Sequence, residues 1–305
     1  MLQNITLVAT QVFVLFILMG VGFVSNKIKL LNEKTVSEVT NFVLYIVTPC
    51  VIINSFSRTF DKAYLKGLII TFVASFLSFF LNILITKLII HDKIKEKEKI
   101  ARYGAVFSNS AYMAIPLQQA LLGDDGVFYG AIYVAVFNIM NWTYGISLMS
   151  GDKKIISVKK IIFNPGIIGT FFGVLVFLMP FALPRVISKP IEYLAALNTP
   201  LPMIVIGYHL AESDFKIKGF WLYFSMAYRL IISPLLIMII LYLVGVEKIT
   251  MLSITIALSA PFAATTSMFS EKFGGDTKLA AATVSLTTLI TIITMPLVIG
   301  LAMNL

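Results

Sequence analysis

Residues 103–123 read YGAVFSNSAYMAIPLQQALLG, and residues 250–275 read TMLSITIALSAPFAATTSMFSEKFGG. Each stretch places a proline and several amide or hydroxyl side chains inside an otherwise apolar run. A proline removes one backbone donor and clashes with the preceding helical turn, so Pro116 and Pro261 predict broken helices. In an apolar layer the freed carbonyls and half-helix ends need partners, which polar side chains or a ligand supply. These two stretches therefore predict both the architecture and the functional site.

The composition of the whole chain fits helices of this kind. The 305 residues are 58% hydrophobic and 13% charged, with a mean hydropathy of +0.92. Soluble domains are typically about 45–50% apolar and about 25% charged, which excludes an ordinary soluble enzyme. A spanning helix needs about 20 apolar residues. Ten apolar runs of about this length occur, at 5–25, 36–56, 67–90, 103–122, 127–149, 161–183, 189–211, 219–245, 250–272 and 278–302. Together with their connections they leave no room for a separate soluble domain. We predict an all-α integral membrane protein with ten transmembrane helices.

Basic residues in the connections predict the orientation. Counted on alternate sides of the ten runs, 17 lysines and arginines fall on one side and 6 on the other, while Arg229 lies within a run. The positive-inside rule places the richer side in the cytoplasm and both termini outside it. The net charge of +9 is thus a topology and lipid-contact signal, and no nucleic-acid partner is expected. We expect a multi-pass protein of the plasma membrane.

The two halves of the chain show a weak internal repeat. An offset of 151 residues aligns Gly22 with Gly173, Ser37 with Ser188, Thr48-Pro49 with Thr199-Pro200, Gly123 with Gly274, and Asp125 with Asp276. An odd number of helices per half inverts the second copy, so residues 1–150 and 151–305 predict two inverted five-helix repeats. Inverted repeats with broken helices are typical of secondary transporters that bind their substrate near the membrane midplane. Pro116 and Pro261 do not align at this offset, so the halves are not copies in detail.

The candidate binding residues surround the two prolines. Helix N-termini carry partial positive charge and suit a carboxylate. The alternative interpretation is that the prolines only kink packed helices, while the hydroxyls bond to their own backbone. The candidates in the two broken helices are Asn109, Ser110, Tyr112, Pro116, Ser259, Pro261, Thr265 and Thr266.

Two further polar residues lie within apolar runs. Arg229 follows Lys218 by 11 residues, or roughly 16 Å of helix, which places it near the midplane. It is either a counter-charge for an anionic substrate, or an arginine whose long side chain snorkels to the interface or bonds to backbone freed by Pro234. Asn41, eight residues before Pro49, either bonds between helices or lines the facing side of the site.

Motifs for other chemistries are absent from the sequence. One cysteine, Cys50, and two histidines exclude a Cys/His metal cluster. Neither HExxH nor GxSxG nor GxxxxGK[ST] occurs, so we expect no enzyme, no catalytic residue, no cofactor and no direct ATP drive. Coupling to sodium, to protons or to membrane potential alone is left open, as is any metal site.

Three segments resemble the auxin efflux carrier family, which includes the plant PIN-type carriers and bacterial malate- and malonate-type permeases. They are LMGVGFVSNKIKLLNEKTVSEVTNFVLYIVTPCVIINSF at 18–56, SNSAYMAIPLQQALLGDDGVFYGAIYVAVFNIMNWTYG at 108–145 and FNPGIIGTFFGVLVF at 163–177. The resemblance, to a bacterial member, implies the inverted-repeat fold of the bile acid/sodium symporter superfamily. It implies a scaffold of spans 1, 2, 6 and 7, a transport domain of spans 3–5 and 8–10, and crossing spans 4 and 9. It also implies an elevator movement and a homodimer through the scaffold helices. Plant members carry a long central loop where this chain has only SGDKKIISVKK, so loop regulation is not carried over.

The function expected from these features is secondary-active transport of a small organic anion, malate-like or auxin-like. The alternatives are a sodium-coupled symporter of another small solute, and a channel or non-transporting sensor on the same fold. Saturable counterflow distinguishes a carrier from the last two. Substrate identity and the direction of flux do not follow from the sequence.

Overall fold

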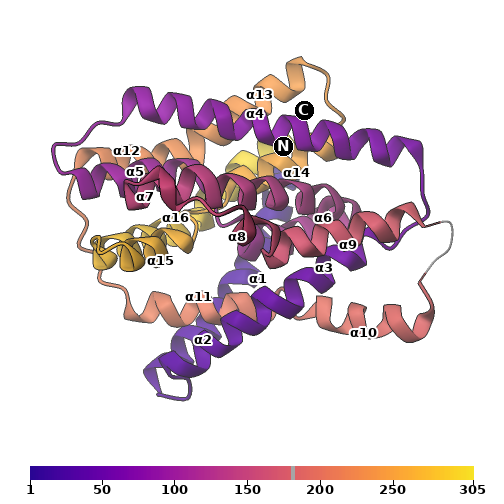
Figure 1. Ribbon diagram of the computed structural model, residues 1–305, viewed down its shortest axis with the longest axis horizontal. Helices are drawn as coiled ribbons and strands as arrows, with labels where there is room; N and C mark the ends of the chain where they lie inside the picture. Colours follow the sequence, from indigo (N-terminus) through magenta and orange to yellow (C-terminus); the bar gives the residue numbers. More distant parts are fainter. Residues whose placement is uncertain (180–182) are drawn as a thin grey trace.

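The computed structural model describes residues 1–179 and 183–305, and every regular element in this part of the chain is helical (Figure 1). The elements up to residue 150 are α1 (Leu2–Lys27), α2 (Glu33–Phe42), η1 (Val43–Val47), α3 (Thr48–Phe56), α4 (Lys62–Ile89), α5 (Lys95–Val106), η2 (Ser110–Ala114), α6 (Ile115–Met140), η3 (Asn141–Gly145) and α7 (Ile146–Ser150).

The second half of the chain continues in the same way. Its elements are η4 (Lys153–Ile155), α8 (Val158–Ile162), α9 (Pro165–Leu178), α10 (Arg185–Ala196), α11 (Pro200–Glu212), α12 (Phe220–Ala227), η5 (Tyr228–Ile232), α13 (Ser233–Leu243), α14 (Lys248–Ser259), α15 (Thr265–Lys272) and α16 (Thr277–Ala302). Apart from η4, a 3₁₀ turn, the η elements are single π-helical turns that join successive α-helices.

Seven helical stretches of the described residues are long and apolar enough to cross a membrane, which confirms a multi-pass integral membrane protein. They are Leu2–Lys27, Glu33–Phe56, Lys62–Ile89, Ser110–Ser150, Arg185–Glu212, Phe220–Leu243 and Thr277–Ala302. Two shorter apolar helices, α9 and α14, coincide with the sixth and ninth predicted runs. The end of the sixth run, 161–183, includes residues 180–182, which lie outside the described residues.

Polar residues at the helix ends explain where several helices begin. The side chains of Asn32, Asp61 and Asp276 accept hydrogen bonds from backbone N–H groups in the first turns of α2, α4 and α16. Within the stretch Ser110–Ser150, helical geometry is interrupted at Gly123, which has φ 65° and ψ −153°. This left-handed φ favours glycine, so Gly123 separates the helix that contains Pro116 from the helix that follows.

The outer surface of the bundle is apolar, as a lipid-facing surface must be. Phe13, Ile17, Leu77 and Phe80 on α1 and α4 are each more than half exposed. A water-exposed surface rarely carries contiguous apolar side chains of this size, whereas a bilayer accepts them.

The helices pack in two groups that meet along α1 and also where α6 packs on α3 and α9. Figure 1 shows α2, α10 and α11 together at one edge of the molecule and α4 and α13 at the opposite edge. The closest packing pairs are α1 with α11 and α16, α3 with α9, and α6 with α14. The broken segments α5–η2 and α14–α15 belong to the group that includes α4 and α13.

Candidate functional site

The two helix breaks lie against each other inside the bundle. The backbone N–H of Asn109 donates to the carbonyl of Pro261 at 2.8 Å, and the N–H of Ala263 donates to the carbonyl of Phe107 at 3.0 Å. Ser108 and Phe262 thus form an isolated antiparallel bridge between extended segments. Each break satisfies part of the other's exposed backbone, which is the main requirement for irregular backbone at membrane depth.

The break in the second half lies where the sequence predicts it. Helix α14 ends at Ser259, and Ala260, which precedes Pro261, has an extended ψ of 151°. The proline ring disfavours helical geometry in the residue before it, and the extended Ala260 fits this preference, so α14 ends directly before Pro261.

The break in the first half lies earlier than predicted. Helix α5 ends at Val106, the extended segment is 107–109, and Pro116 stands in the first turn of α6, after the π-helical turn η2. The prediction that Pro116 itself breaks the helix was wrong. Pro116 follows the π-helical turn η2 in a helix that begins at Ser110, and a local π-helical adjustment accommodates the proline without a break. The chain is opened instead by the pairing of Phe107 and Asn109 with the opposite break.

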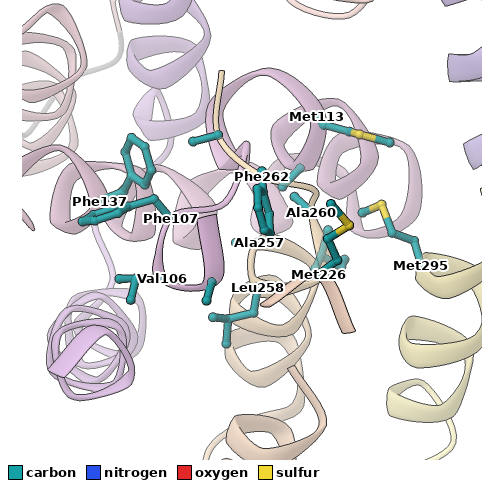
Figure 2. Close-up of a cluster of buried hydrophobic side chains, with 14 of the residues drawn as sticks. Val106, Phe107, Met113, Phe137, Met226, Ala257, Leu258, Ala260, Phe262 and Met295 are labelled. Atoms are coloured by element: carbon teal, nitrogen blue, oxygen red, sulfur yellow. The ribbon is translucent and has the colours of Figure 1, made fainter. Parts of the chain in front are cut away.

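Apolar packing fixes the two breaks in place. Figure 2 shows Phe107 beside Phe137, and Phe262 near Ala257 and Ala260. The ring centroids of Phe107 and Phe137 are 5.7 Å apart, and both Phe107 and Phe262 are fully buried. The crossing is therefore a packed structure with defined positions for its polar atoms.

Arg229 joins the C-terminal ends of both broken helices. Its Nη1 donates to the carbonyls of Ala105 at 3.3 Å and Val106 at 3.0 Å, and its Nη2 donates to the carbonyl of Leu258 at 2.6 Å. The side chain is fully buried. Of the two interpretations drawn from the sequence, backbone bonding therefore describes its contacts, but the carbonyls belong to α5 and α14 and not to backbone freed by Pro234.

A second polar contact joins three elements beside the break. The hydroxyl of Tyr103, on α5, bonds to Thr265 Oγ1 at 2.6 Å, and it also bonds to the Oδ1 of Asn141 in η3. Tyr103 is fully buried and Asn141 is 1% exposed. Sequence analysis missed Tyr103. The available signal was a tyrosine inside an apolar run, because a buried phenol usually requires a hydrogen-bond partner.

The candidate residues fall into groups with different surroundings. Ser259 and Thr266 donate to the carbonyls of Thr255 and Ala263 in their own segment, as the alternative interpretation of the prolines expects. Asn109 is 6% exposed and its amide has no hydrogen-bond partner among the described residues; Ser110 Oγ is buried and likewise has none. Among the candidates, Asn109 and Ser110 therefore carry side-chain polar groups at the first break that the described residues leave without a partner. The same holds for the neighbouring Ser108 Oγ, whereas Thr265 is bonded to Tyr103.

Two candidates lie away from the bridge. Tyr112 is half-buried in η2, two residues beyond Ser110. Asn41 is exposed on α2, which packs on η1 and α11, and the structure does not bring it to the breaks. In the described part of the chain, no three His, Cys, Asp or Glu side chains gather as a metal site would require.

We predict that Tyr103→Phe lowers the free energy of unfolding by about 2 kcal/mol, because it leaves the buried oxygen of Asn141 and the half-buried oxygen of Thr265 without their partner. A double-mutant cycle with Thr265→Val, measured by denaturation in detergent, should show coupling of about 1 kcal/mol. Tyr144→Phe is the matched control, since the Tyr144 ring also stacks on Phe107 but its hydroxyl has no partner among the described residues. Equal losses for the two tyrosine variants would contradict the network.

Apolar helices that break in pairs and bridge their backbones at depth are the architecture of a membrane transporter. Comparison with known proteins gives the same class: a family described as membrane transport proteins matches residues 7–299. This chain belongs to that family, and the resemblance to the auxin efflux carriers is confirmed.

Curated relatives match most of the length of the chain. An uncharacterized transporter of Methanocaldococcus jannaschii is 25% identical over 292 residues, covering 91% of this chain and 93% of its own. A protein of Rhizobium meliloti named "Putative malonate transporter" is 22% identical, with 83% and 82% covered. An uncharacterized transporter of Methanothermobacter thermautotrophicus is 22% identical, with 92% and 94% covered. The family and these relatives are transporters and not enzymes, which agrees with the sequence analysis.

Proposed function

We propose that this protein is a secondary-active carrier of a small organic anion, which binds at the N-terminal ends of η2 and α15. The supporting observation is the contrast between the two kinds of helix end at the breaks. Arg229 bonds to the carbonyl ends of α5 and α14, whereas neither Asn109 nor Ala264 caps its helix with a side chain. Uncapped N-terminal N–H groups favour a carboxylate.

The side chains around these ends suit a small acid. The amide of Asn109 and the hydroxyl of Ser110 provide donors, and Tyr112 adds a half-buried ring. Thr265 is the first residue of α15, and its hydroxyl is bonded to Tyr103. The relative from Rhizobium meliloti is named for malonate, a dicarboxylate, and this favours malonate-like and malate-like acids as the first substrates to test. An auxin-like monocarboxylate is the second class.

The architecture that we propose has ten spans in two inverted repeats, 1–150 and 151–305. Its support is a symmetry in the packing: α1 packs on α11, which is span 1 on span 7, and α3 packs on α9, which is span 2 on span 6. Exchange of the repeats converts one pair into the other. These spans would form a scaffold, as a homodimer, and the remaining spans would move past it in an elevator movement. Both termini would face outward from the plasma membrane.

The test is a thermal-shift screen of the purified protein against malonate, malate and indole-3-acetate, each in sodium or potassium buffer. A ligand at a hundredfold excess over its dissociation constant stabilises the protein by about 2.7 kcal/mol. We expect one acid to raise the Tm, and Asn109→Ala and Thr265→Ala to abolish that shift. Ser267→Ala is the control, because the Ser267 hydroxyl bonds only to the carbonyl of Ala264 in its own segment.

The outcomes separate the candidate functions. Stabilisation by a neutral or cationic solute and by no acid overturns the anion proposal. A shift that requires sodium favours the sodium-coupled symporter. Saturable counterflow of the stabilising acid in proteoliposomes supports a carrier, whereas binding without counterflow indicates a sensor, and non-saturable flux a channel.

A further inference from the structure

Arg229 is a buried cation held at the meeting point of two helix C-termini. The carbonyls of Ala105 and Val106 end α5, and the carbonyl of Leu258 lies at the end of α14. A helix C-terminus carries about half a negative elementary charge, so two of them together match one guanidinium. The side chain is 0% exposed, and bulk water therefore does not supply this compensation.

Among the described residues, no carboxylate forms an ion pair with Arg229. The ion pairs of the described residues involve Arg58, Arg102 and three lysines, and none of them includes Arg229. The neutral hydroxyl of Tyr133 lies close to the guanidinium, and neither it nor Ser108 Oγ has a hydrogen-bond partner among the described residues. An arginine without an acidic partner is stable here only because the two helix ends supply negative potential.

The same features argue against direct contact between Arg229 and a substrate. The guanidinium uses Nη1 and Nη2 on backbone oxygens, and its Nε is sealed from solvent without a partner. A substrate anion would have to displace carbonyl oxygens of two helices to reach it. Arg229 thus acts on the helix ends that form the crossing.

We infer that Arg229 takes the place of a bound metal cation. Its guanidinium neutralises the partial negative charge at the C-terminal ends of α5 and α14, where the two broken helices cross. Carbonyl oxygens at the C-terminal ends of broken helices are the usual ligands of coupling ions in transporters. A covalently attached guanidinium holds those oxygens permanently, so the crossing needs no sodium or potassium ion for its stability. As a consequence for transport, which rests on the proposed carrier function, movement of the substrate is independent of sodium.

The experiment compares charge with shape at position 229. Wild type, Arg229→Lys and Arg229→Met are purified, and the Tm of each is measured in chloride salts of sodium, potassium, choline and methylguanidinium at equal ionic strength. Lysine keeps the charge, and methionine keeps much of the length without it. Arg102→Met is the matched control. Arg102 also donates to carbonyls near a helix end, those of Ile90 and Lys87, but it is paired with Glu98 near the surface.

We expect the Tm of wild type and of Arg229→Lys to be the same in sodium and in choline. Arg229→Met should have a Tm about 10 °C below wild type, because two helix ends lose their neutralising charge. Methylguanidinium or sodium should recover several degrees of that loss, and neither salt should stabilise Arg102→Met more than wild type. A merely structural role for Arg229 predicts no dependence on the cation.

Two results would overturn the inference. One is a Tm of Arg229→Met that is low but identical in all four salts. The other is a sodium-specific stabilisation of wild type or of Arg229→Lys, which would show an open cation site despite the charge at 229. If Arg229→Met does not fold even with methylguanidinium, the Tm values of wild type and Arg229→Lys in sodium and in choline still test the inference. No carboxylate enters these measurements, so failure of the anion proposal and failure of this inference are distinguishable.

Discussion

Replacing Gly104 by valine is expected to lower the free energy of unfolding by at least about 3 kcal/mol, because the new side chain would overlap the ring of Phe262. A Cβ atom at position 104 would lie 2.1 Å from Cε2 and 2.2 Å from Cδ2 of that ring. The backbone of Phe262 is held in place by hydrogen bonds on both sides. Its own N–H donates to Thr287 Oγ1 at 3.2 Å, and the N–H of the adjacent Ala263 donates to the carbonyl of Phe107. Relief of the overlap therefore requires the two helix breaks to separate.

Thermal or denaturant unfolding in detergent measures this effect, with Gly20→Val as the control. Gly20 is also helical, but a Cβ there meets nothing within 4 Å. Its valine variant should stay within about 1 kcal/mol of wild type. The double variant Gly104→Val/Phe262→Ala should be less unstable than the sum of its single changes, since the alanine removes the obstacle. Additive losses, or equal stability of the two valine variants, would contradict the packing of Phe262 on Gly104.

Locking α11 to α16 is expected to stop transport altogether if the two groups of helices slide past each other. The Oγ atoms of Ser213, at the end of α11, and Ser285, on α16, form a hydrogen bond at 2.5 Å. Cysteines at both positions therefore bring two sulfur atoms together with little change in shape. The background is Cys50→Ala, which removes the single native cysteine of the chain.

Counterflow of the acid identified by the thermal-shift screen is then measured before and after oxidation. We expect Ser213→Cys/Ser285→Cys to lose counterflow when oxidised and to regain it with a reductant, while each single cysteine variant is unaffected by either treatment. The reduced double variant is the matched control, because it differs from the oxidised protein only in the cross-link. Full counterflow after complete oxidation would exclude an elevator movement between α11 and α16.

The helical nature of the protein and the neighbourhood of the breaks followed from local sequence. Proline disfavours a helical residue before it, and this local preference predicts the end of α14 at Pro261. The preference is not absolute, because Ile115 before Pro116 and Ser233 before Pro234 are helical. The first break did not follow from Pro116 in the same way. Its position at 107–109 depends on pairing with the opposite break, and neighbouring residues carry no signal for such a partner.

By itself, therefore, the sequence determined the membrane class, the apolar helices and the segments in which helices break, because partition into lipid and proline geometry are properties of short stretches. Only the tertiary structure decided what the buried polar groups contact. Tyr103 meets Thr265 across 162 residues of chain, and Arg229 reaches the carbonyl ends of two helices from a third. A buried charge or hydroxyl is stabilised by whichever atoms surround it in space, and chain folding alone sets those distances.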